Sequence, residues 1–112
     1  MQITCTQESG VQILKVGEQR IDASVAIQFK DKMRTETTGA AGPFVLDLSD
    51  VSFIDSSGLG AIVAALKQLD VDQTLALSGL TPAVDKVFRL TRMDKVFKIH
   101  DTARSAVRAH GL

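Results

Sequence analysis

The stretch FVLDLSDVSFIDSSGLGAI, residues 44–62, decides the fold, because it passes from a strand pattern to a helical one. Its first five residues are a short apolar run typical of a buried strand. From Leu59 onward, apolar residues spaced by three and four predict an amphipathic helix that begins just after two serines. Glycines in or near the first turn of a helix cost about 1 kcal/mol each relative to alanine. The chain has Gly58 and Gly60 there despite this cost, so we ask which contact or function requires glycine at these positions.

Segments on both sides of this stretch continue the alternation of strands and helices. We expect strands at 2–7, 11–16, 44–48, 74–80 and 96–99, the first two forming a hairpin with Glu8-Ser9-Gly10 in its turn. Helices are expected from Asp22 to about Thr38, from Leu59 onward, after Thr81-Pro82, and from Asp101 through Arg108. Asp22 or Ser24 is expected to cap the first helix, and Asp101 the last. This order predicts an α/β fold, with a mixed β-sheet of about four to five strands and about four helices packed on it. The serine turn is then expected at the C-terminal end of a central strand.

Length and composition indicate one ordinary globular domain. The 112 residues, 45% of them hydrophobic and 23% charged, are enough to build one core, so we expect a single domain over residues 1–112. Thirteen basic and thirteen acidic side chains cancel. The basic surface that nucleic acids or anionic membranes require is missing, so neither is expected as a partner.

Targeting signals and cysteine usage suggest the cytoplasm. The first ten residues show no secretory signal pattern, and the longest apolar run, residues 61–66, is far shorter than the roughly 20 residues that span a bilayer. The single cysteine, Cys5, cannot form an internal disulfide. We interpret Cys5 as a small core residue on a strand, not as a nucleophile.

Common glycine-rich catalytic motifs do not fit residues 55–60. A dinucleotide fingerprint would need a small residue where Val63 stands, and a phosphate-binding loop would need a lysine earlier than Lys67. A nucleophile elbow would need glycine two residues before and two after Ser57. No Cys or His pair has metal-ligand spacing. We therefore expect no enzymatic activity, no cofactor and no metal.

Two interpretations of the serines remain. A serine hydroxyl exposed at a helix N-terminus is a good phosphate acceptor, because the helix dipole tolerates an added anion there. The alternative is that Ser56 and Ser57 only cap the helix. The chemistry of the residues leaves both open.

The stretch LDLSDVSFIDSSGLGAIVAAL resembles the signature of STAS domains of the anti-sigma factor antagonist family. The spacing of RIDA before it and of LSGLTPAVDKVFRLTRMDKVFKI after it is also similar, so the resemblance covers nearly the whole chain. It implies that Ser57 is the phosphoacceptor, with Ser56 as a minority candidate. It also implies a partner-binding surface made by Asp22, Asp55, Ser56, Gly58, Leu59 and Gly60.

The resemblance also implies a mechanism. The unphosphorylated form would bind an anti-sigma factor with serine kinase activity and release a sigma factor. Phosphorylation of Ser57 would reverse this, and a PP2C-type phosphatase would reset the protein. An alternative is an accessory STAS subunit of a phospholipid-transporting ABC system. A nucleotide- or ligand-sensing module has no pocket signal in the sequence.

Overall fold

An antiparallel hairpin begins the fold. Its strands are β1 (Ile3–Glu8) and β2 (Val11–Val16), paired with Ile3 opposite Val16. Ser9 and Gly10 form the turn, with φ angles of 50° and 81°. Two positive φ angles match a type I′ turn, whose twist suits paired antiparallel strands. The hairpin expected from sequence is therefore confirmed in this computed structural model, which describes residues 1–110.

A mixed five-stranded sheet with four helices builds the rest of the fold, as predicted. The other strands of this sheet are β4 (Phe44–Asp47), β6 (Leu75–Ser78) and β7 (Ile99–His100). The strand order is β1-β2-β4-β6-β7, with β2, β4, β6 and β7 parallel to one another. The helices are α1 (Ala26–Thr37), α2 (Ser56–Lys67), α3 (Pro82–Leu90) and α4 (Ala103–His110), with a short 3-10 turn, η1 (Met93–Lys95).

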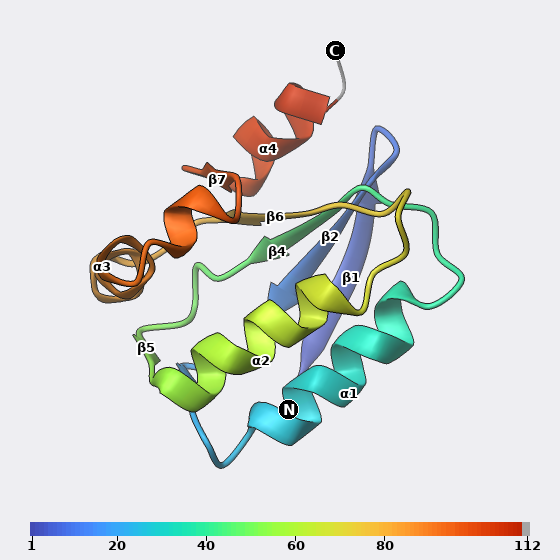
Figure 1. Cartoon of the computed structure of the whole chain (residues 1–112). Coiled ribbons are helices and arrows are strands. Elements are labelled where there is room, and N and C mark those ends of the chain that lie inside the picture. Colours follow the sequence, from blue (N-terminus) through green and yellow to red (C-terminus); the bar gives the residue numbers. More distant parts are fainter. Residues whose placement is uncertain (111–112) are drawn as a thin grey trace.

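Helices cover both faces of the sheet. Helices α1 and α2 lie side by side over one face, and α4 lies over the other (Figure 1). The larger core forms on the α1 and α2 face and includes the fully buried Phe29, Phe44 and Phe88. A smaller core joins Val45 to residues of α4. Burial of apolar surface on both faces holds the layers together.

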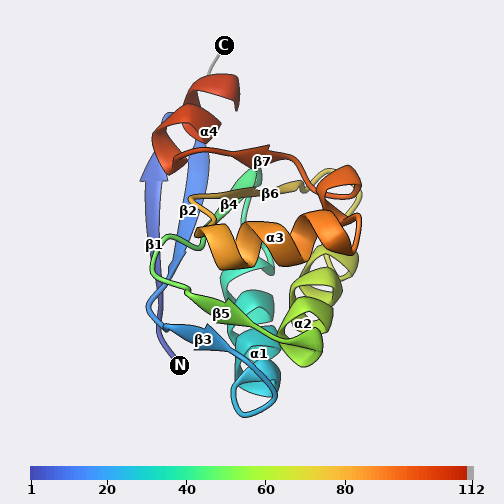
Figure 2. The same cartoon turned by 90° about the vertical axis from the view of Figure 1, so that its left-hand side faces the viewer.

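A second, two-stranded parallel sheet was not predicted. It pairs β3 (Arg20–Ile21) with β5 (Phe53–Ile54), next to the N-terminal end of α2 (Figure 2). The expectation that the serine turn follows a central strand is therefore wrong. The turn follows β5, because the chain leaves the central strand β4 after Asp47 and crosses to the small sheet before α2 begins.

Three expectations about helix and strand ends are also wrong. Helix α1 begins at Ala26, not Asp22, and no side chain caps it. Helix α4 is capped by Thr102, not Asp101: Thr102 Oγ1 accepts from the Ser105 amide at 3.0 Å. Strand β7 lies at 99–100 instead of 96–99, because the turn that begins at η1 continues past it: the amides of Val96 and Phe97 both donate to the Met93 carbonyl.

Cys5 is not a core residue. It lies on β1, which among residues 1–110 pairs with β2 alone and so forms an edge of the sheet. The Cys5 side chain is exposed. The alternation of residues along β1 predicted the strand correctly, but it could not show that the strand lies at an uncovered edge.

Candidate functional site

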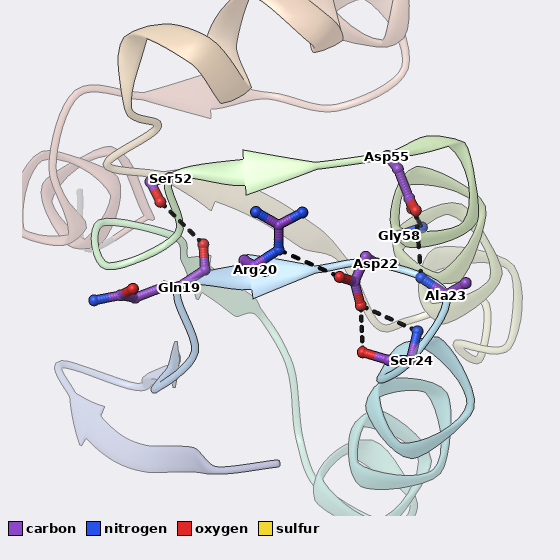
Figure 3. Close-up of polar contacts among 8 residues, drawn as sticks. All are labelled: Gln19, Arg20, Asp22, Ala23, Ser24, Ser52, Asp55 and Gly58. Atoms are coloured by element: carbon purple, nitrogen blue, oxygen red, sulfur yellow. Dashed lines mark hydrogen bonds and ion pairs between the residues drawn. The ribbon is translucent and has the colours of Figure 1, made fainter.

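The two short strands bring two aspartates to the same end of the small sheet. Asp22 directly follows β3, and Asp55 directly follows β5. Because Ile21 is the register partner of Ile54, the residues after them lie at equivalent positions. Asp22 and Asp55, 33 positions apart in sequence, thus lie at the start of α2 (Figure 3).

Asp55 links the start of α2 to the loop before α1. Its Oδ1 accepts a hydrogen bond from the Gly58 amide at 2.8 Å, which makes Asp55 the N-cap of α2. Its Oδ2 accepts from the Ala23 amide at 3.3 Å. One carboxylate therefore satisfies an unpaired donor of the helix and fixes a loop distant in sequence.

Neither Ser56 nor Ser57 caps the helix, so that interpretation is wrong. Both are helical residues in the first turn, and Asp55 performs the capping. Both side chains are exposed, and within residues 1–110 neither hydroxyl makes a hydrogen bond. Each hydroxyl is consequently available for chemistry at the positive end of the helix dipole. The geometry does not choose between the two serines.

Gly58 has a packing role within the domain. It is buried, and a Cβ placed there would lie 1.9 Å from the carbonyl oxygen of Ile21. The family resemblance places Gly58 in the partner-binding surface, but a side chain at this position would first of all disturb folding. Gly60, by contrast, is exposed, and a methyl group added there would have nothing within 4 Å; Leu59 is half-buried against the main core.

Asp22 is held by neighbours on its own loop. Its Oδ1 accepts from both the amide and the hydroxyl of Ser24, and its Oδ2 accepts from Arg20 Nε at 3.3 Å. The hydrogen bond from the Ser24 hydroxyl is the main reason that the pKa of Asp22 lies below its usual range, and the Arg20 guanidinium adds to it. Asp22 is therefore a fixed negative charge beside the serine turn.

Arg20 and Phe53 are two residues of this region that the sequence reasoning missed. The Arg20 guanidinium carbon lies 4.1 Å from the centre of the Phe53 ring. No local pattern predicts this contact, because the register of two two-residue strands creates it.

No helix among residues 1–110 is long and apolar enough to cross a lipid bilayer.

Comparison with known proteins supports a family assignment. The family described as STAS domain matches residues 2–106 of the chain. An anti-sigma-B factor antagonist from Listeria monocytogenes is 32% identical over 90 residues, which cover 80% of this chain and 77% of that protein.

Two solved structures have the same fold. One is an anti-sigma factor antagonist (STAS) domain protein from Planctomyces limnophilus, 25% identical, with a TM-score of 0.86 and 96% of each chain covered. The other is an anti-sigma factor antagonist from Mycobacterium paratuberculosis, also 25% identical with a TM-score of 0.86, covering 96% of this chain and 92% of that one.

Proposed function

The chain belongs to the STAS domain family, and from this premise we propose that it is an anti-sigma factor antagonist that acts by partner switching. In its unphosphorylated form it binds an anti-sigma factor with serine kinase activity, which frees a sigma factor. The kinase then phosphorylates Ser57 and the complex separates. A PP2C-type phosphatase removes the phosphate. Residues 1–112 act as one STAS domain in the cytoplasm, and the chain itself needs no catalytic group.

One observation carries this proposal: among residues 1–110 the hydroxyls of Ser56 and Ser57 are exposed and make no hydrogen bond, beside a cap that needs neither of them. The family resemblance selects Ser57 of the two. Asp55 supplies the N-cap, so modification of Ser57 removes no hydrogen bond from the fold. A phosphate adds a charge of about −1.5 to −2 at this position. An anion at an exposed helix N-terminus gains about 0.3–1 kcal/mol from the dipole. The domain is therefore expected to stay folded when phosphorylated.

A partner bound over the serine turn would be affected by the phosphate more strongly than the domain itself. The phosphate would lie two residues from Asp55, on the turn that Asp55 caps, and Asp22 follows the paired strand at the same end of the small sheet. The interface would therefore have to bury several negative charges. Leaving a charge buried without a partner in an interface costs about 2–5 kcal/mol. This corresponds to a loss of affinity of about thirty-fold to several-thousand-fold. Phosphorylation would thus separate the complex while leaving the domain intact.

The test is a pull-down from native lysate with partners identified by mass spectrometry. Wild type and Ser57→Ala should recover a protein with a kinase-type ATP fold, and Ser57→Asp should not. Gln68→Glu is the matched control, because it adds one negative charge at the opposite, C-terminal end of α2. It should bind as wild type does.

Other outcomes would contradict the proposal. Recovery of transporter subunits by both wild type and Ser57→Asp would favour the accessory role in phospholipid transport. Incubation of the recovered kinase with ATP tests the acceptor directly. If Ser57→Ala is phosphorylated as fully as wild type and Ser56→Ala is not, the acceptor is Ser56.

A further inference from the structure

The outer face of the small sheet carries an exposed pair made by an arginine and a phenylalanine. Ile21 and Ile54 point into the core, so the residues before them point outward. The Arg20 side chain is 60% exposed and Phe53 is 39% exposed. In Figure 2 strands β3 and β5 face the viewer, and no helix lies in front of them.

Two contacts fix the guanidinium of Arg20. Its Nε donates to Asp22 Oδ2 at 3.3 Å, and its Cζ lies 4.1 Å from the centre of the Phe53 ring. The two Nη atoms point away from Asp22 (Figure 3). Among residues 1–110 they form no hydrogen bond or ion pair. The Nη groups, which are donors of the kind that bind a carboxylate, are therefore held in place and have no acceptor among these residues.

We propose that Arg20 and Phe53 form a second contact with the same anti-sigma factor, beside the serine turn. The two Nη atoms of Arg20 bind a carboxylate of the partner, and the Phe53 ring covers an apolar side chain next to it. This inference rests on the proposed function. It adds a chemical requirement on the partner, which must present an acidic residue close to an apolar one.

Three physical arguments favour the anti-sigma factor as the partner that contacts Arg20 and Phe53. Arginine and aromatic residues are enriched at the centres of protein interfaces, where a few side chains supply most of the affinity. The guanidinium is already held in place, so binding loses less side-chain entropy than it would with a mobile arginine. The pair is also continuous with the proposed switch surface, because Arg20 contacts Asp22 and Asp22 lies beside Asp55.

A purely positioning role for Arg20 makes a different prediction. If Arg20 only orients Asp22, Arg20→Ala should not weaken partner binding any further in the Asp22→Asn variant, where the charge that Arg20 orients is already gone. If Arg20 contacts the partner, Arg20→Ala should weaken binding in the Asp22→Asn background as well. This double-mutant comparison separates the two roles.

The experiment measures affinity by calorimetry between the purified full chain and the kinase-fold protein that the pull-down identifies. Arg20→Ala and Phe53→Ala should each weaken binding about tenfold or more, and Arg20→Lys should restore only part of the loss. Phe53→Leu tests the ring itself, and should also weaken binding. Arg34→Ala and Leu90→Ala are the controls, since they remove an exposed arginine and an exposed large apolar side chain on other elements. Both control variants should bind the partner as tightly as wild type does. All variants in this experiment should keep a melting temperature close to that of wild type.

The outcomes separate this inference from the proposed function. If Ser57→Asp abolishes binding while Arg20→Ala and Phe53→Ala stay within twofold of wild type, the second contact is wrong and the switch stands. An effect of Arg20→Ala that vanishes in the Asp22→Asn background reduces Arg20 to a positioning residue. If wild type recovers no kinase-fold protein, or Ser57→Asp binds as well as wild type, both proposals are wrong.

Discussion

The carbonyl oxygen of Ile21 lies so close to Gly58 that a single methyl group at Gly58 would be 1.9 Å from it. Real side-chain carbons do not approach backbone oxygen that closely. Only glycine lets the first turn of α2 lie against β3. This close approach also brings Asp55 within reach of the Ala23 amide.

The first prediction compares the two glycines of the turn. Gly58→Ala should lower the free energy of unfolding by about 1–3 kcal/mol, because its methyl group meets fixed backbone. Gly60→Ala should raise it by about 0.5–1 kcal/mol, since the site is exposed and alanine favours a helix. Urea unfolding followed by circular dichroism measures both. Equal effects at the two positions would show that Gly58 does not pack against Ile21.

The second prediction concerns Asp55. Asp55→Ala should destabilise the fold by about 0.5–2 kcal/mol through loss of the N-cap. Asp55→Asn should keep most of this stability, because asparagine is also a good cap, but its single carbonyl oxygen cannot serve both amides well. The Ala23 amide should therefore exchange with solvent faster in Asp55→Asn, as measured by NMR.

Ser57→Ala is the control for this experiment. Its hydroxyl makes no hydrogen bond within the described part of the chain, so stability should change by no more than about 0.5 kcal/mol. A loss as large as that of Asp55→Ala would show that Ser57 shares the capping.

The third prediction is a pH dependence through Asp22. The folded-state pKa of Asp22 is lowered, chiefly by the Ser24 hydroxyl. A lowered folded pKa favours the folded state above the unfolded pKa of about 3.9, and this contribution is lost as the pH falls through the folded value. Wild type should thus be more stable than Asp22→Asn at pH 6, and the difference should shrink on acidification below about pH 3.9.

Direct titration tests the cause of that shift. Ser24→Ala removes the hydroxyl that donates to Asp22, so the pKa of Asp22 should rise. NMR titration of the Asp22 carboxyl carbon measures it. An unchanged pKa would assign the shift to the Ser24 amide and the Arg20 guanidinium instead.

The fourth prediction uses Cys5 as a probe of the sheet edge. Because Cys5 is exposed on β1, a thiol reagent should modify it fully in the folded protein. Partial desolvation and the nearby Glu36 carboxylate raise the pKa of the thiol, so the reaction at neutral pH should be slower than in urea. Glu36→Gln should speed it. Modification only after unfolding would show that β1 is covered.

Sequence patterns predicted the parts of the fold that depend on neighbouring residues. The β1–β2 hairpin follows from alternation around the Ser9-Gly10 turn, and α2 follows from apolar residues spaced by three and four. Strands β3 and β5 were not predicted. Each has only two residues, too few to show a period, and each is a strand only because the other lies beside it.

The same division applies to the candidate site. The chemistry of the turn and the family resemblance predict Ser57, Asp55 and Asp22 as site residues from the sequence, and this stays a prediction. The bond from the Ala23 amide to Asp55, the packing of Gly58 against Ile21 and the stacking of Arg20 on Phe53 depend on contacts across more than thirty positions of sequence. Local patterns contain no information about such contacts.

The sequence by itself therefore determined the alternation of strands and helices, the family and the serine-glycine turn, because periodicity and turn chemistry act between neighbours. Only the tertiary structure decided that Asp55 also binds the Ala23 amide, that Gly58 is the packed glycine and that Asp22 lies beside the serine turn. These depend on where β3 places Ile21 and Ala23 against the start of α2. That placement results from the packing of the whole core, to which residues from nearly every element contribute.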